Sequence, residues 1–366
     1  MSKFLRNLTN RCRRKHELKE LPGKAWLAVR DYQQNLFDEL SIDPAKPGNK
    51  TSFYGDLVYC EGSKPTAFWH RNILEKPFIA EFKTIREAAD ILRSVQRNWA
   101  HHPVACFRRT ELIKEKLPFI NEKPRTFPFE VPLVPMGMWS LLDEKTLFAS
   151  AVTSSPFPAG EIRFVEDHVN PPSRAYMKLY EALTWAGYLE ERDRAGEAGT
   201  IPNGRYTKNE TALPDDSIPT GRYTKIPFLP APGSRCVDAG ACPGGWTWVL
   251  NSFGAQVTAI DRSELDPRLM AKPDITFLKH DAFTLKPSDF GPQDWVCSDV
   301  ICYPPRLLEW VEEWLASGLC RNMICTIKMQ GKADHETTRA FAAIPGSKVV
   351  HLTANKNELT WIYRRP

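Results

Sequence analysis

Several common features are missing from this 366-residue sequence. It has no uncharged apolar run near 18 residues, which excludes a conventional transmembrane helix. No apolar segment follows its basic beginning, so we expect no secretory signal, no membrane partner and a cytoplasmic protein. None of its nine cysteines forms a Cys-x-x-Cys pair, and its eight histidines do not cluster with them, so no metal site is predicted. Cys236, Cys297 and Cys325 instead lie in apolar runs, as buried thiols in a reducing compartment do.

The sequence also lacks the usual phosphate-binding motifs. In "CVDAGACPGGWTWVL" (Cys236–Leu250), the three glycines do not have the Gly-x-Gly-x-x-Gly spacing, and no Walker lysine follows. Glycines after an apolar run nevertheless let the backbone pass close to a ligand, and the helix that follows offers free N–H groups. Asp238 precedes this turn, where a carboxylate would repel phosphate and suit an ammonium group.

The length predicts two domains, and the charge is uneven along the chain. Residues 1–30 carry nine Lys and Arg against two Glu, with "RCRRK" at Arg11–Lys15. We therefore expect residues 1–50 to form a basic arm, which either binds nucleic-acid phosphates or is a solvated terminus.

Residues 51–167 read as an α+β domain. Thr84 and Glu87 have the spacing of a capping box, and apolar residues follow it at helical intervals. The proline-rich run Pro118–Pro135 predicts a loop. Strands are expected at Asp56–Gly62, Pro77–Phe82 and Thr146–Ser154.

Residues 168–366 show a different pattern. A helix is expected after "VNPP", and residues 190–233, rich in Gly, Pro and Asp, predict a loop insertion in which "GRYTK" occurs twice, at Gly204–Lys208 and Gly221–Lys225. From Cys236 onward, short β-branched strands alternate with helices, which favours a doubly wound, mostly parallel α/β sheet. The last two strands are separated by a short loop, so we expect them to pair antiparallel.

Two more acids follow later strands of this domain. Asp261 comes after "VTAI" and Asp281 after "FLKH". Ligands of a doubly wound sheet bind beyond the carboxyl ends of its strands, where such acids can accept hydrogen bonds from ribose hydroxyls and an adenine amino group. With Asp238 for an ammonium, the three acids together predict S-adenosylmethionine as the cofactor, although any one of them could simply cap a helix.

At this point the sequence resembles a known family. "DAGACPGGWT" and the upstream "PPSRAYMKLYEAL" are similar to FtsJ-like RNA 2′-O-ribose methyltransferases, closest to the ribosomal RNA large-subunit methyltransferase M family, which acts on a cytidine ribose. The resemblance implies a Rossmann-like class I methyltransferase sheet over residues 168–366 and an RNA partner. The N-terminal half resembles that family's ferredoxin-like and THUMP RNA-binding region only loosely. The cofactor-binding residues then expected are Asp238, Gly240, Ala241, Pro243, Gly244, Gly245, Trp246, Asp261, Asp281 and Asp299.

The resemblance also implies a catalytic Lys-Asp-Lys-Glu tetrad. Its members would be Lys178 in "SRAYMKL", Asp299 in "CSDVICYPP", Lys328 in "CTIKMQG" and Glu358 in "NKNELTWIY". A ribose 2′-hydroxyl is a poor nucleophile, so its methylation needs a base. A neutral lysine can serve, and we assign Lys328 as this base, with Lys178 the second candidate and the two acids as orienting groups.

Other functions are less consistent with the sequence. A cytosine C5 methyltransferase needs a cysteine nucleophile, but strand alternation puts Cys325 and Lys328 on opposite faces. A base-amine methyltransferase would show Asn/Asp-Pro-Pro-aromatic, whereas Asp299 is followed by Val-Ile-Cys and then Tyr303. An RNA-binding protein with a relic methyltransferase domain stays possible at this point, and cofactor binding would distinguish it.

Overall fold

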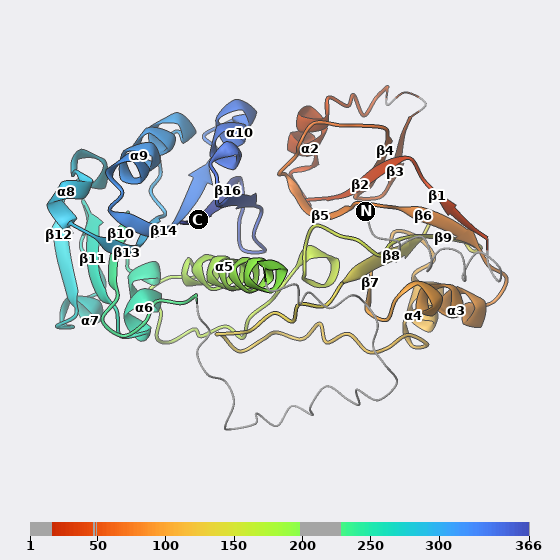
Figure 1. Cartoon of the computed structure of the whole chain (residues 1–366), viewed down its shortest axis with the longest axis horizontal. Coiled ribbons are helices and arrows are strands. Elements are labelled where there is room, and N and C mark those ends of the chain that lie inside the picture. Colours follow the sequence, from red (N-terminus) through yellow and green to blue (C-terminus); the bar gives the residue numbers. More distant parts are fainter. Residues whose placement is uncertain (1–16, 47, 49, 198–227, 366) are drawn as a thin grey trace. The chain divides into compact units, whose positions relative to one another are not determined.

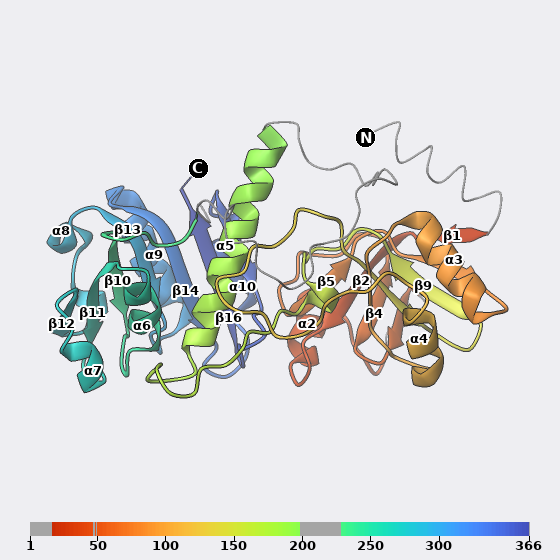
Figure 2. The same ribbon diagram turned by 90° about the horizontal axis from the view of Figure 1, so that it is seen from below.

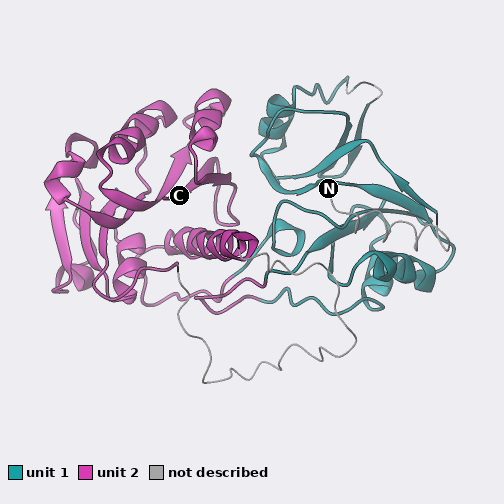
Figure 3. Ribbon diagram, in the orientation of Figure 1, with its two compact units in different colours: residues 1–123, 133–163, 202–204 teal, residues 124–132, 164–201, 205–366 magenta. Residues whose placement is uncertain are grey.

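The computed structural model describes residues 17–46, 48, 50–197 and 228–365. These residues form two compact units (Figure 3): unit 1 comprises the residues up to Lys123 and Leu133–Arg163, and unit 2 comprises Pro124–Pro132 and the residues from Phe164 onward. The basic segment Arg11–Lys15 and both "GRYTK" copies lie outside the described residues.

Unit 2 contains one seven-stranded sheet with the order β12-β11-β10-β13-β14-β16-β15. The neighbours from β12 to β14 pair in parallel, while β16 pairs antiparallel with both β14 and β15. The predicted doubly wound sheet and its antiparallel final pair are confirmed. The strands are β10 (Arg235–Ala239), β11 (Gln256–Asp261), β12 (Ile275–Lys279), β13 (Gln293–Ser298), β14 (Cys320–Lys328), β15 (Ser347–Val350) and β16 (Glu358–Arg364).

Helices cover both faces of this sheet, which explains why its strands are continuous apolar runs. Figure 1 shows α8, α9 and α10 on one face, and α5 and α6 on the other. Val237, Val296 and Ile324, in the central strands, have no exposed surface. The helices are α5 (Tyr176–Glu197), α6 (Gly245–Ser252), α7 (Pro267–Met270), α8 (Pro287–Phe290), α9 (Pro304–Ser317) and α10 (His335–Ala343), with a 3-10 turn η2 (Ala282–Thr284).

Helix α5 runs further than the sequence pattern indicated (Figure 2). The predicted insertion begins at residue 190, but the helix continues to Glu197. Arg364 of β16 explains the difference, because it donates to Glu190 at 2.9 Å and also contacts Asp193, which holds the last turns of α5 to the sheet. In the described part of the chain, no helix is both long and apolar enough to cross a membrane.

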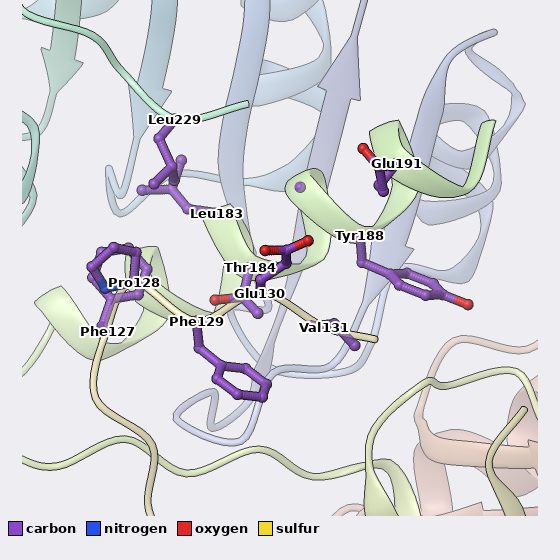
Figure 4. A pocket seen from close by; sticks show the side chains of 11 residues that line it. Phe127, Pro128, Phe129, Glu130, Val131, Leu183, Thr184, Tyr188, Glu191 and Leu229 are labelled. Carbon is purple, nitrogen blue, oxygen red and sulfur yellow. The ribbon is translucent and has the colours of Figure 1, made fainter. Parts of the chain in front are cut away.

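The proline-rich run is a loop, as predicted, and its middle part belongs to unit 2. Phe127 stacks on Tyr180 of α5 with ring centroids 3.7 Å apart. Leu183, Thr184 and Tyr188 of the same helix line a small cavity of about 30 Å³ beneath this loop (Figure 4). Residues 124–132 therefore pack across the outer side of α5.

Unit 1 contains two sheets, with the strand orders β1-β6-β9-β8-β7 and β3-β4-β2-β5. Residues 18–40, which the sequence analysis placed in an arm, form two strands and a helix here, because Ala25, Leu27 and Leu36 are fully buried in the unit. The elements are β1 (Leu18–Glu20), β2 (Gly23–Ala28), α2 (Gln33–Leu40), β3 (Thr51–Tyr54), β4 (Leu57–Glu61), β5 (His70–Leu74), β6 (Phe78–Glu81), α3 (Ile85–Val95), β7 (Trp99–His101), α4 (Phe107–Lys114), β8 (Gly137–Leu141), β9 (Thr146–Ser150) and a 3-10 turn η1 (Pro158–Gly160).

The core of unit 1 has two parts. Helix α3 packs Ala88, Ile91 and Leu92 against the larger sheet. Phe148 and Met138 on its strands join Leu27 of the smaller sheet in a second cluster. The Thr84 side chain accepts a hydrogen bond from the Glu87 N–H at 3.1 Å, so the predicted helix start is confirmed.

A buried tryptophan of β16 gives a test of the packing of the unit 2 sheet. Trp361 of β16 is fully buried, stacks beside Tyr363 and donates from Nε1 to the Phe341 carbonyl at 3.0 Å. We expect Trp361→Ala to lower the free energy of unfolding by about 3–5 kcal/mol, because it leaves a large cavity in the core. Urea unfolding followed by circular dichroism measures this, with Met270→Ala, at an exposed position, as the control. A loss no larger than the control's would contradict the packing described.

Candidate active site

The carboxyl ends of the parallel strands meet at one edge of the unit 2 sheet. The strand order reverses between β10 and β13, and a crevice at such a reversal is the usual ligand site of a doubly wound fold. Gly240 follows β10, Asp261 ends β11 and Asp281 follows β12. The sheet therefore brings the predicted acids of neighbouring strands to the same edge.

The glycine turn after β10 is held by backbone hydrogen bonds and by its neighbours. The N–H groups of Gly240 and Ala241 both donate to the Ile260 carbonyl, and the φ angle of Gly240 is +78°. A Cβ atom on Gly240 would lie 2.5 Å from Val300 Cγ2, one on Gly244 2.3 Å from Leu269 Cδ1, and one on Gly245 2.6 Å from Ser173 Oγ. The sequence predicts ligand approach at these glycines, and the structure adds that protein atoms occupy the Cβ position at all three.

Asp238 lies inside the fold rather than on the turn. Its side chain has no exposed surface, and one oxygen accepts a hydrogen bond from the Thr247 hydroxyl at 2.6 Å. The other oxygen has no partner among the described residues. Burial raises the pKa of Asp238 to about 7, with the nearby charge of Asp299 adding to the effect. The acid that the sequence predicts for an ammonium group is thus buried, and only one of its two oxygens has a hydrogen-bond partner.

Asp261 joins the end of β11 to the glycine turn. Its two oxygens accept hydrogen bonds from the N–H groups of Cys242 and Ser263 at 3.0 and 2.9 Å. It also lines a cleft of about 340 Å³. Each carboxylate oxygen has a second lone pair, so Asp261 can still accept a hydrogen bond from a ligand hydroxyl.

Asp281 lies on the same cleft. It accepts a hydrogen bond from the Phe283 N–H at 3.1 Å and forms an ion pair with Arg262. The Arg262 guanidinium holds the pKa of Asp281 below its ordinary value, so this acid is ionised at neutral pH. The cleft is lined by Gly240, Ile260, Asp261, Arg262, His280, Asp281, Ala282, Phe283, Val300, Ile301, Cys302 and Arg306.

The four tetrad residues are brought together from four separate elements. Lys178 Nζ donates to both oxygens of Asp299, at 2.7 and 2.8 Å, and to Glu358 at 3.2 Å. Lys328 Nζ donates to the Asp299 carbonyl at 2.7 Å and lies 3.1 Å from its carboxylate. The Lys178, Lys328, Asp299 and Glu358 side chains are 9%, 19%, 14% and 14% exposed, so solvent reaches all of them only partly.

Sheet register explains this convergence of residues far apart in the sequence. Lys328 at the end of β14 and Glu358 at the start of β16 are directly paired. Asp299 follows β13, the strand on the other side of β14. Lys178 lies in the first turn of α5, which packs on β16.

Three further residues of the glycine turn were also predicted to bind the cofactor. Trp246 is 2% exposed, and its Nε1 donates to the Ala175 carbonyl at 2.9 Å, so it packs beneath the turn. Ala241 is buried, whereas Pro243 is exposed and its carbonyl accepts from the Asp266 N–H at 3.0 Å. Of these three, only the surface of Pro243 is open to a ligand.

The sequence analysis missed several residues of the cleft. Arg306 donates to the Phe283 carbonyl at 3.0 Å and lies over its ring, joining the start of α9 to η2. Ile301 is 77% exposed at the cleft. A signal was present in the run Val300–Cys302, where an apolar segment directly follows the predicted catalytic acid.

Cys325 is unsuited to nucleophilic catalysis. It is fully buried, and burial raises the pKa of its thiol well above the ordinary value. Burial also raises the pKa of the Cys302 thiol, to about 11. Neither thiol is ionised at neutral pH, which argues against a cysteine-based mechanism at this edge.

The buried Asp238 gives a test in which the effect depends on pH. Because its folded-state pKa is raised, the native protein binds the extra proton, and the stability that this acid contributes is lost as pH rises from about 4 to about 7. Asp238→Asn should match the parent near pH 4.5 and exceed its free energy of unfolding by a few kcal/mol near pH 8. Urea unfolding at both pH values measures the difference. An equal difference at both pH values would show that Asp238 does not titrate in this range.

Comparison with known proteins agrees with the sequence resemblance. Residues 222–344 match the family model described as FtsJ-like methyltransferase. A "Ribosomal RNA large subunit methyltransferase M" from Azoarcus sp. strain BH72 is 34% identical over 178 residues, which is 49% of this chain and 39% of that protein. One of the same name from Thauera aminoaromatica is 43% identical over 100 residues, 27% of each chain. The chain thus spans less than half the length of these relatives.

Solved structures also resemble parts of the chain. The fibrillarin pre-rRNA processing protein of Methanococcus jannaschii matches at a TM-score of 0.30 and 18% identity, over 38% of this chain and 70% of that one. Aeropyrum pernix fibrillarin with bound S-adenosyl-L-methionine matches at a TM-score of 0.28 and 18% identity, over 37% and 68%. The family match and the named relatives confirm the resemblance found in the sequence: residues 222–344 are similar to FtsJ-like methyltransferases.

Proposed function

We propose that the protein is an S-adenosylmethionine-dependent methyltransferase that methylates a ribose 2′-oxygen of RNA. The observation that carries this proposal is the Asp299 carboxylate, which contacts the ammonium groups of both Lys178 and Lys328 beside the cleft. Such a cluster of two lysines and two acids can orient a hydroxyl and accept its proton. The family match supports the methyltransferase class.

The residues of the cleft fit the proposed cofactor. Asp261 and Asp281 lie where a ribose and an adenine can be hydrogen-bonded, and Gly240 offers the cleft a surface without a side chain. The buried Asp238, with one unpartnered oxygen, lies behind the turn, where a cationic amino-acid end would favour its ionised form. When bound, S-adenosylmethionine supplies an electrophilic methyl group on a sulfonium.

Lys328 is the better candidate for the base. Lys178 lies between two carboxylates, so neutralising it would leave both acids without their closest positive charge. Lys328 contacts one carboxylate oxygen and one neutral carbonyl. It is also the more exposed of the two, at 19% against 9%, which leaves room for a substrate hydroxyl.

The other three residues hold Lys328 and the sugar in place. Asp299 fixes Lys328 through its carbonyl and Lys178 through its carboxylate. Glu358 lies opposite Lys328 in the β14–β16 ladder and accepts a hydrogen bond from Lys178. The tetrad therefore holds Lys178 between two acids, while Lys328 faces the reacting oxygen.

The proposed substrate is a cytidine of large-subunit ribosomal RNA, following the names of the matched relatives. We propose that unit 1 is a THUMP-like, RNA-presenting domain and that the basic residues of segment 1–16 guide the RNA strand. The excess positive charge of this segment supports the role, because cations bind phosphates by releasing counterions.

The role of Lys328 is tested by Lys328→Ala. We expect methyl transfer to fall by about 10²–10⁴-fold, because general-base catalysis contributes that much, while cofactor affinity stays within about twofold. Methylated nucleosides are measured by mass spectrometry after the enzyme acts on large-subunit ribosomal RNA from cells that lack this gene. Isothermal titration measures S-adenosylmethionine binding.

Two variants sharpen this experiment. Lys328→Arg keeps the charge but cannot act as a neutral base, so it should be as inactive as the alanine variant. Lys332→Ala removes a nearby exposed lysine and should keep activity. Full activity in Lys328→Ala would end the assignment, and a parent protein that fails to bind the cofactor would indicate a relic domain.

The basic arm is tested by deleting residues 1–16, which removes six Lys and Arg and no acids. RNA affinity should fall, and the slope of log K against log salt should become shallower by up to about four, since each phosphate contact on a single strand contributes about 0.7. Fluorescence anisotropy between about 50 and 200 mM salt measures this. An unchanged slope would show that the arm does not contact phosphates.

A further inference from the structure

The loop between β13 and α9 exposes two large apolar side chains beside the tetrad. Ile301 is 77% exposed and Tyr303 is 64% exposed. Other aromatic residues of this region are buried: Trp310 and Trp314 on α9 are 3% and 1% exposed. Leaving a tyrosine and an isoleucine in water forgoes the free energy of their burial, which suggests a binding role.

This loop is fixed at both ends. Asp299 at its start is held by both catalytic lysines, and Val300 fills the space beside Gly240. At its end, the Tyr303 carbonyl accepts hydrogen bonds from the N–H groups of Arg306 and Leu307 at 3.1 and 3.2 Å. The exposure of the two side chains is therefore a property of an anchored backbone.

Side chains along the loop alternate between inside and outside. Val300 and Cys302 are half-buried, whereas Ile301 and Tyr303 project into solvent. Among the described residues, the Tyr303 ring has no stacking partner and its hydroxyl has no hydrogen bond, unlike Tyr176 and Tyr180 of α5. Tyr303 thus presents an open ring face.

Distance links this ring to the chemistry. Tyr303 is four residues from Asp299, so their Cα atoms are separated by at most about 14 Å. A ribose whose 2′-hydroxyl reaches Lys328 carries its base on the adjacent carbon atom, and the base must extend into the space around the tetrad. A planar base needs a flat apolar surface there, and an exposed tyrosine is what RNA-binding proteins use.

We propose that Tyr303, with Ile301 beside it, is the surface on which a base of the substrate RNA stacks, positioning the target ribose at Lys328. The inference rests on the proposed function and adds a base-binding subsite centred on Tyr303, which does not line the cofactor cleft, whereas Ile301 lies at the edge of that cleft. Tyr303 is a positioning residue here, since it contacts the base and not the reacting oxygen.

The test measures binding to bases separately from methyl transfer. The probes are a labelled oligocytidylate of about twelve nucleotides and an abasic ribose-phosphate oligomer of the same length, titrated into the full chain. The parent should bind the base-containing oligomer about tenfold more tightly or better. Tyr303→Ala should reduce this preference about five- to tenfold, and Ile301→Ala should reduce it less.

Matched variants decide what the ring contributes. Tyr303→Phe keeps the ring face and should retain the parent's preference within about twofold, whereas loss in this variant would overturn stacking in favour of a hydroxyl contact. Met270→Ala removes another exposed side chain of unit 2 and should change nothing. An unchanged preference in Tyr303→Ala, or a parent that does not distinguish the two oligomers, would overturn the proposal. If the surface binds a protein partner instead of a base, Tyr303→Ala should likewise leave the preference for the base-containing oligomer unchanged.

The two levels of proposal fail differently. Methyl transfer to RNA together with base-independent binding would reject the stacking surface alone. Base-dependent binding through Tyr303 in a chain that transfers no methyl group would reject the proposed function and leave the surface in place. In an active chain, Tyr303→Ala should also raise KM for RNA while cofactor affinity is unchanged, which a general loss of folding would not produce.

Discussion

The bond between Lys178 and Asp299 is the interaction on which the rest of the site depends. It links the first turn of α5 to the end of β13, and through the Asp299 carbonyl it also fixes Lys328. A mostly buried ion pair gains less than its attraction suggests, since both charges lose water. Removing one partner is costly, however, because the remaining charge stays buried. The ion pair therefore adds little net stability, but losing either partner would leave the other charge buried and unpaired.

The tetrad is also balanced in charge, with two ammonium groups and two carboxylates. Balance allows four ionisable groups to be crowded at 9–19% exposure without a net buried charge. The balance is uneven between the lysines, since Glu358 contacts Lys178. This asymmetry gives two chemically identical side chains different surroundings, which the order of residues in the sequence does not reveal.

Much of the architecture could be predicted from local patterns. Alternating β-branched runs and helix starts indicated the doubly wound sheet, and Thr84 marked the start of α3. Contacts between distant segments could not be predicted in this way. The burial of Leu27 in unit 1, the stacking of Phe127 on Tyr180 and the ion pairs that extend α5 to Glu197 depend on residues far apart in the chain. The contacts of the glycines could not be predicted either, because the sequence shows their spacing but not the residues that pack against them.

Those neighbours show how the glycine turn and the cluster of two lysines and two acids are coupled. Gly245 has no side chain because Ser173 and the start of α5 pack directly against it. The Trp246 ring donates to the Ala175 carbonyl, which also accepts the Lys178 N–H. The residues that shape the turn thus also set the position of the helix that carries Lys178. The glycine motif, which the sequence predicts to bind a ligand, therefore also fixes the position of Lys178 relative to the cleft. Its residues are constrained both by the cleft and by the helix that carries Lys178.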